Sequence, residues 1–279
     1  MHRLAIIGCG KIGQAILRGL VRSGAVAGKD IVVCDLARDP LAGVLAETGS
    51  DFTLNPGEAV GMAGAVVLAV KPKDVERVLT DIPPGAIRDK LLISVAAGCS
   101  LRMLTGWLPP GTRIVRAMPN APALVCKGVT AYTAETEVTE ADHDFVRSLF
   151  SALGSVHPMS EPDLEVATGL SGSGPAYLMT VVEAMADGAV RCGLGRELAV
   201  EMAARTMAGA AELILQTGQH PAIWRDAIAS PGGTTMAGLA ALEAGGARAA
   251  FIEAVTAATL RGREMVAPHR NGKEEVDDD

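Results

Sequence analysis

Short apolar runs alternate with helical patterns over the first half of the chain. The runs are rich in Val, Ile and Leu, which is typical of strands buried on both faces of a parallel sheet. They cover residues 3–7, 31–34, 65–70, 91–95, 113–117 and 129–133. Segments with helical periodicity lie between or after several of them, at residues 11–22, 72–79, 100–107 and 140–153. This alternation predicts a doubly wound parallel sheet with right-handed crossovers.

The pattern changes near residue 160, where the strand signals stop. Long Ala- and Met-rich helical segments follow, separated by glycines, at residues 175–192, 196–216, 234–244 and 247–264. We therefore predict an α/β fold with an N-terminal Rossmann-type domain over residues 1–159 and an all-α domain over residues 160–268. The many small residues on the later helices permit close packing, either within the chain or between subunits.

Composition narrows the classes of partner. The 279 residues suffice for two domains, the aromatic fraction is 3% and the net charge is −7. Few aromatic residues and a negative charge argue against base stacking and phosphate-backbone binding, so we expect no nucleic-acid partner. Part of the negative charge lies in residues 269–279, which we predict to be a disordered acidic tail.

The cysteines and the apolar runs indicate in which cellular compartment the protein is located. The five cysteines, Cys9, Cys34, Cys99, Cys126 and Cys192, are far apart, and no Cys-x-x-Cys pair occurs. This spacing argues for a reducing compartment and against a structural metal site. The first apolar run is too short for a signal peptide, and no run reaches the roughly 20 residues of a membrane span. We expect a cytoplasmic protein with no metal and no membrane contact.

A glycine loop follows the first predicted strand and opens the first predicted helix. Its residues are Gly8, Cys9, Gly10, Lys11, Ile12 and Gly13, which form the pattern Gly-x-Gly-x-x-Gly. In this context the glycines allow a tight turn, close approach of a pyrophosphate and close helix–strand packing, while the helix N-terminus attracts the anion. The loop predicts dinucleotide binding; the alternative is a tight strand–helix turn without a ligand.

Two residues after the second predicted strand favour different cofactors. Asp35 ends that strand, where a carboxylate normally accepts hydrogen bonds from the adenine ribose and favours NADH. Arg38 follows three residues later and is suited to the 2′-phosphate of NADPH. The alternative for Arg38 is a solvated charge in a turn. The residues leave the choice between NADPH and NADH open.

Several later motifs carry a family resemblance. They are the segments at residues 69–72 (Ala-Val-Lys-Pro), 94–98 (Ser-Val-Ala-Ala-Gly), 116–122 (Arg-Ala-Met-Pro-Asn-Ala-Pro), 169–177 (Gly-Leu-Ser-Gly-Ser-Gly-Pro-Ala-Tyr) and 230–235 (Ser-Pro-Gly-Gly-Thr-Thr). In this order the chain resembles pyrroline-5-carboxylate reductases from Leu4 to about Glu264. The resemblance implies NADPH- or NADH-dependent reduction of 1-pyrroline-5-carboxylate to L-proline, the final step of proline biosynthesis. It also implies a homodimer formed through the helical domain and further assembly into a decamer.

The resemblance implies which residues contact the cofactor. Most follow the carboxyl ends of strands, where ligands bind in an open α/β sheet. Asn55 matches the family's asparagine near the adenine ribose, although this chain carries one extra residue before Glu58. The other implied contacts are Ala69, Val70, Lys71, Pro72, Ala96, Ala97 and Asn120. Without the family, Lys71 reads as a surface charge at a strand end.

The resemblance places the substrate in the helical half. Residues 230–235 are rich in backbone donors, which can form a nest for a carboxylate. Their alternative reading is a Pro-Gly turn followed by a Thr N-cap. The family match implies that Ser230, Gly233, Thr234 and Thr235 bind the substrate, with the Thr235 hydroxyl at the ring nitrogen as the catalytic group. Glu161 matches an acidic residue near the substrate amine.

Two other functions fit parts of the pattern. A β-hydroxyacid dehydrogenase or another imine reductase shares this domain order, but alcohol oxidation of that kind needs a lysine, and residues 161–265 contain none. A nucleotide-sensing protein without catalysis would not need the second anion nest at residues 230–235. The chain departs from the family at Ala227, where relatives often carry an Asn or Gln that faces the substrate.

Overall fold

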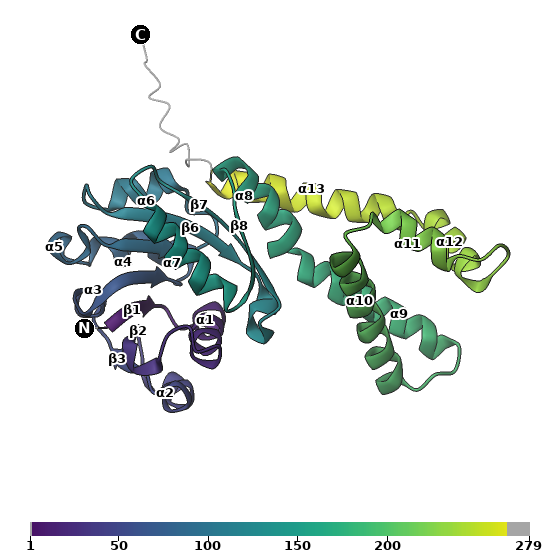
Figure 1. Cartoon of the computed structure of the whole chain (residues 1–279), viewed down its shortest axis with the longest axis horizontal. Coiled ribbons are helices and arrows are strands. Elements are labelled where there is room, and N and C mark those ends of the chain that lie inside the picture. Colours follow the sequence, from purple (N-terminus) through teal and green to yellow (C-terminus); the bar gives the residue numbers. More distant parts are fainter. Residues whose placement is uncertain (1, 267–279) are drawn as a thin grey trace, which may run out of the picture. The chain divides into compact units, whose positions relative to one another are not determined.

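A computed structural model describes the chain from His2 to Val266 (Figure 1). Its described residues form two compact units, one from His2 to Gly172 together with residues 258–266, the other from Ser173 to Ala257. The predicted acidic tail, residues 269–279, lies outside the described residues. No helix within the described range is both long enough and apolar enough to cross a membrane.

The first unit is built on an eight-stranded sheet. Its strands are β1 (His2–Ile7), β2 (Ile31–Cys34), β3 (Asp51–Thr53), β4 (Ala63–Leu68), β5 (Leu91–Ser94), β6 (Arg113–Pro119), β7 (Gly128–Ala134) and β8 (Gly154–Pro158). They lie in the order β3-β2-β1-β4-β5-β6-β7-β8, and every pair except β6–β7 is parallel. The strand order reverses between β1 and β4, which is the point where doubly wound sheets bind dinucleotides.

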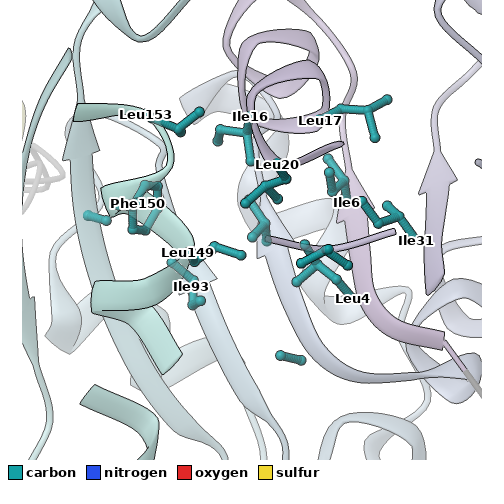
Figure 2. Packing of buried hydrophobic residues seen from close by; sticks show 14 of the residues in the cluster. Leu4, Ile6, Ile16, Leu17, Leu20, Ile31, Ile93, Leu149, Phe150 and Leu153 are labelled. Carbon is teal, nitrogen blue, oxygen red and sulfur yellow. The ribbon is translucent and has the colours of Figure 1, made fainter. Parts of the chain in front are cut away.

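Helices cover both faces of this sheet (Figure 1). They are α1 (Lys11–Arg22), α2 (Ala42–Thr48), α3 (Pro56–Met62), α4 (Pro72–Thr80), α5 (Pro84–Ile87), α6 (Leu101–Trp107), α7 (Glu140–Ser151) and α8 (Glu161–Ala167). Figure 2 shows part of one core cluster, which includes Ile16 and Leu20 of α1, Phe150 of α7 and Ile6 of β1. A second buried cluster packs α3, α4, α5 and α6 against the other face. The predicted α/β fold class is confirmed.

The sequence pattern missed some elements of the sheet. The edge strands β3 and β8 are short and only partly buried, so they carry no continuous apolar run. The strand β7 runs antiparallel to β6, whereas the alternation of elements predicted a parallel sheet. The segment between them holds only the short 3-10 helix η3 (Ala121–Val125), which is too short for a crossover to a parallel neighbour.

The second unit is helical. It contains α9 (Gly174–Arg191), α10 (Arg196–Thr217), α11 (Pro221–Ile228), α12 (Thr234–Ala244) and most of α13 (Ala247–Val266). Few of its side chains are buried, and those are small, such as Ala186, Ala199 and Ala203. Large apolar residues remain exposed, including Met179, Leu215 and Ile252. Exposed apolar surface of this extent is typical of a protein–protein interface.

The domain boundary predicted between residues 159 and 160 differs from the division into compact units. The contacts place α8 and the following π-helical segment η4 (Thr168–Gly172) with the sheet, so that the first unit ends at Gly172. The residues of α13 from Ala258 also belong to the first unit. Whether the functional domains follow the predicted boundary stays a prediction.

The helix α7 begins with a reciprocal capping box. The Thr139 hydroxyl accepts a hydrogen bond from the Asp142 N–H, and the Asp142 carboxylate accepts one from the Thr139 N–H. Arg113 of β6 donates to the same carboxylate at 2.8 Å. Burial alone would raise the pKa of Asp142, but these hydrogen bonds and the Arg113 charge together lower it. The carboxylate therefore joins the helix start to the sheet.

We predict that Asp142→Asn lowers the free energy of unfolding at pH 7 by about 1 kcal/mol, because the cap and the ion pair both weaken. The folded-state pKa lies below the roughly 3.9 of an unfolded aspartate. The stabilisation is therefore complete above that pH and disappears as the pH falls through the folded-state pKa. Urea unfolding at pH 7 and at low pH measures this, with exposed Asp144→Asn as the control. A difference between wild type and Asp142→Asn that stays constant down to pH 2 would contradict the prediction.

Candidate active site

The glycine loop lies at the strand-order reversal, between the ends of β1 and β4. Gly8 has a φ of +89°, and a Cβ built there would lie 2.7 Å from the carbonyl carbon of Ala69. A Cβ on Gly13 would collide with the Gly8 carbonyl oxygen. By contrast, a Cβ on Gly10 would meet no heavy atom within 4 Å. Two of the glycines are thus needed for packing, and the third faces open space.

The N-terminus of α1 is open to an anion. Its N-cap is Gly10, which has no side chain to bond the first N–H groups of the helix. Lys11 begins the helix and is exposed, while Ile12 is half-buried. Unpaired N–H groups and the helix dipole together favour negative charge at this position. These features fit the pyrophosphate of a dinucleotide.

The peptide groups of Cys9 are held from two sides. The Cys9 N–H donates to Asp35 Oδ2 at 2.6 Å, and the Cys9 carbonyl accepts from Gln14 Nε2 at 3.1 Å. Burial, followed by the charge of Asp35, raises the pKa of the Cys9 thiol to about 11. The thiol is therefore neutral at physiological pH and adds no negative charge to the loop. Sequence reasoning missed Gln14, which carries no motif signal of its own.

The residues expected near the adenosine half follow β2, β3 and β4. Arg38 is exposed at the start of the 3-10 helix η2 (Asp39–Leu41). Asn55 is the N-cap of α3, and its Oδ1 accepts from the Glu58 N–H at 3.1 Å. Lys71 is the N-cap of α4, with an exposed side chain, and Pro72 is the first residue of that helix. Ala69 donates its N–H to the Ile7 carbonyl at 2.7 Å, which places residues 69–72 beside the glycine loop.

The residues expected near the nicotinamide follow β5 and β6. Ala96 is buried and Ala97 is half-buried. Asn120 is buried, and its carboxamide has two backbone partners: Oδ1 accepts from the Val129 N–H at 2.9 Å, and Nδ2 donates to the Ser171 carbonyl at 3.0 Å. Parallel strands bring these residues to the same edge of the sheet as the glycine loop. Asn120 also links that edge to the π-helical segment η4.

A buried ionic cluster lies behind this edge. Arg116 of β6 is 3% exposed, and its Nη1 lies 2.6 Å from Glu165 Oε1 and 3.1 Å from Glu161 Oε1. Glu161 Oε1 also accepts from the Leu101 N–H at 2.8 Å, at the start of α6. The cluster therefore joins β6, α6 and α8. Sequence reasoning missed this role of Arg116 and Glu165, although a charge inside an otherwise apolar strand indicates a buried partner.

The loop expected to bind the substrate lies in the second unit. Gly233 is the N-cap of α12, and Thr234 is its first residue, so the threonine does not take the capping position. The Gly233 N–H donates to the Ser230 carbonyl at 3.0 Å, and Gly232 has a φ of +70°. No side chain caps the helix, which leaves the N–H groups of Thr234 and Thr235 without an intrahelical partner. N–H groups of this kind at a helix start favour negative charge nearby.

The structure thus brings most predicted cofactor residues together on the first unit. Glu161 belongs to this unit as well, with its carboxylate on Arg116 and Leu101. Residues 230–235 belong to the other unit. Among the described residues, no cluster of three or more His, Cys, Asp or Glu side chains could hold a metal ion.

Comparison with known proteins identifies relatives over nearly the whole chain. Residues 161–265 match the model of the pyrroline-5-carboxylate reductase dimerisation domain, and residues 3–98 match that of the coenzyme F420-dependent NADP oxidoreductases. The pyrroline-5-carboxylate reductase of Arabidopsis thaliana is 38% identical over 263 residues, which cover 94% of this chain and 95% of the relative.

Two solved structures agree with this match. A pyrroline-5-carboxylate reductase from Coxiella burnetii superposes with a TM-score of 0.88 at 34% identity, covering 95% of this chain and 98% of the other. The pyrroline carboxylate reductase of Plasmodium falciparum, solved with NADP bound, gives a TM-score of 0.87 at 29% identity, with the same coverage of both chains.

We predict that Gly10→Ala leaves the fold intact but impairs dinucleotide binding. The new methyl group meets no protein atom within 4 Å and the backbone φ is −70°, so the stability should change by less than about 0.5 kcal/mol. The methyl group occupies the space that a pyrophosphate needs, so the dissociation constant should rise about tenfold or more. Dinucleotide titration and thermal unfolding measure the two effects. Gly43→Ala, which also adds a methyl group in open space, is the control.

We predict that Arg116→Met destabilises the protein by about 3–5 kcal/mol, because it leaves the Glu165 carboxylate buried without its cation. The double variant Arg116→Met/Glu165→Leu should recover most of this loss, since no unpaired charge remains. Chemical denaturation of both variants measures the difference. Equal destabilisation by the single and double variants would show that the ion pair is not what makes Arg116 necessary.

Proposed function

Because the chain belongs to the pyrroline-5-carboxylate reductase family, we propose that it reduces 1-pyrroline-5-carboxylate to L-proline with NADPH or NADH through the residues described above. The observation that carries this proposal is that two of the helix N-termini without a side-chain cap directly follow the two glycine-containing loops singled out in the sequence. One follows the glycine loop, and the other follows Ser230. A dinucleotide and an imino acid each bring an anionic group, so the reaction needs two such sites.

The first unit would hold the dinucleotide. Gly8, Cys9, Gly10, Lys11, Ile12 and Gly13 would surround the pyrophosphate, with Asp35, Arg38 and Asn55 near the adenine ribose. Ala69, Val70, Lys71 and Pro72 would run beside the cofactor, Ala96 and Ala97 would leave room for the nicotinamide ribose, and Asn120 would hydrogen-bond at the nicotinamide end. The bound reduced cofactor supplies a hydride to the substrate.

The second unit would hold the substrate carboxylate. Ser230 and the turn at Gly233 would shape the nest, and the helix α12 begins there with the backbone N–H groups of Thr234 and Thr235 and no side-chain cap. The positive end of the helix dipole adds to this attraction. Glu161 would face the substrate amine with the part of its carboxylate that Arg116 and Leu101 do not use, since its side chain is 30% exposed.

Thr235 would act at the reacting bond. Its hydroxyl would hydrogen-bond the ring nitrogen while the adjacent N–H groups bind the carboxylate. The protonated C=N bond already carries positive charge, so its carbon accepts a hydride without a strong general acid. The chain's contribution is therefore to hold the ring against the cofactor in one orientation, which converts an encounter of two molecules into a reaction within one complex.

The helical unit would also assemble the enzyme. A dimerisation domain is present over residues 161–265. We propose a homodimer formed through the exposed apolar residues of α9, α10 and α13, further assembled into a decamer. All five cysteines of the chain, three of them buried, are free thiols, which supports location in the reducing cytoplasm.

We predict that Thr235→Ala lowers kcat at least about tenfold, since it removes a hydrogen bond worth about 1.5 kcal/mol at the reacting nitrogen. Cofactor oxidation followed at 340 nm with 1-pyrroline-5-carboxylate measures this. Thr256→Ala is the matched control, because the Thr256 hydroxyl bonds the Ile252 carbonyl of its own helix. Wild-type kcat in the Thr235→Ala variant would refute the role of this hydroxyl, and no turnover by the wild type would refute the function.

A further inference from the structure

The Asp35 carboxylate is held by two different peptide groups. Its Oδ2 accepts the Cys9 N–H at 2.6 Å, and its Oδ1 accepts the Leu36 N–H at 2.7 Å. These N–H groups come from separate segments, the glycine loop and the turn after β2. The carboxylate cannot rotate away from the loop without breaking one of these bonds, and hydrogen bonds to an ionised acceptor are among the stronger ones.

The loop side of this contact is braced as well. Gln14 donates to the Cys9 carbonyl at 3.1 Å, and its Oε1 accepts from Arg18 Nη1 at 2.9 Å. Arg18 in turn pairs with Glu47 of α2 at 2.8 Å. Hydrogen bonds therefore hold both the N–H and the carbonyl group of Cys9. Because the Cys9 N–H binds Asp35, these bonds also fix the position of the Asp35 charge relative to the glycine loop.

The Asp35 charge is not neutralised by a basic side chain. Across residues 2–266, none of the observed ion pairs includes Asp35. Its field reaches the neighbouring thiols: after burial, the Asp35 charge is the next cause that raises the pKa values of Cys9 and Cys34 to about 11. A fixed negative charge thus lies at the end of β2 beside the loop.

From this arrangement we infer that Asp35 makes NADH the preferred dinucleotide of this enzyme. The inference rests on the cofactor site proposed above. An ionised carboxylate has about four lone-pair positions, and two are used by the backbone, so the remainder can accept hydrogen bonds from ribose hydroxyls. The 2′-phosphate of NADPH offers no such donor when ionised. It brings further negative charge toward a carboxylate that cannot move aside.

Arg38 favours NADPH instead, but its contribution to the cofactor preference is smaller than that of Asp35. Its side chain is exposed, and its carbonyl accepts a hydrogen bond from the Leu41 N–H at 2.8 Å. An exposed, flexible arginine loses rotamer freedom when it pairs and contributes little net attraction. Arg38 therefore allows NADPH to be used without making it the better substrate.

The test compares the two cofactors with the full-length enzyme. We expect kcat/KM for NADH to exceed that for NADPH by about tenfold, because like charges are brought together at a partly screened site. The Asp35→Asn and Asp35→Ser variants should reverse or abolish this ratio. Damage to the glycine loop would lower both values together, so the ratio isolates the charge effect. Asp39→Asn, which removes a neighbouring exposed carboxylate, is the control and should keep the wild-type ratio.

Two results would overturn the inference: a wild-type preference for NADPH, or a ratio that is unchanged in both Asp35 variants. Dissociation constants for NADH and NADPH, measured without substrate, separate this inference from the proposed reaction. Suppose that the enzyme binds NADH more tightly than NADPH, with the same dependence on Asp35, yet does not reduce 1-pyrroline-5-carboxylate. This result would refute the proposed reaction and support the cofactor preference.

Discussion

The close approach of two backbone segments at the strand-order reversal is the constraint on which the position of the glycine loop and of α1 depends. After β1 the chain turns at Gly8 directly against the Ala69 carbonyl, which follows β4. A side chain on Gly8 would push these segments apart, and one on Gly13 would lift α1 away from the turn. Because both contacts are made by backbone atoms, they hold the N-terminus of α1 at the strand-order reversal. The first N–H groups of the helix have no side-chain cap there.

A buried ionic cluster connects β6, α6 and α8 near the same edge of the sheet. Arg116 lies within an apolar strand and is compensated by Glu165 and Glu161, and Glu161 also binds the start of α6. The energy of breaking such a cluster is large because a lone buried charge is poorly solvated. The cluster therefore ties α8 to the sheet, which explains why the first compact unit continues to Gly172 although the helical sequence pattern begins near residue 160.

One helix in each unit begins in the same way. In each, a glycine at the N-cap leaves the first N–H groups of a helix without a side-chain partner. A helix N-terminus of this kind attracts an anionic group without adding a charge that titrates near neutral pH. It also suits a reaction in which the substrate carries the activating proton, since the protein then has to orient two ligands more than it has to transfer protons.

Local patterns in the sequence determined the fold class, the main buried strands, the helical second half and the family, all of which are confirmed. These features depend on periodicity, glycines and short motifs, which act between neighbouring residues. Only the tertiary structure decided the edge strands β3 and β8, the reversed direction of β7, the Arg116 cluster and the contact between Asp35 and Cys9. Each depends on groups distant in sequence, such as the 26 positions between Cys9 and Asp35 or the 45 between Arg116 and Glu161. A hydrogen bond or ion pair of this kind leaves no periodic signal, because what selects its residues is their distance in space after the chain has folded.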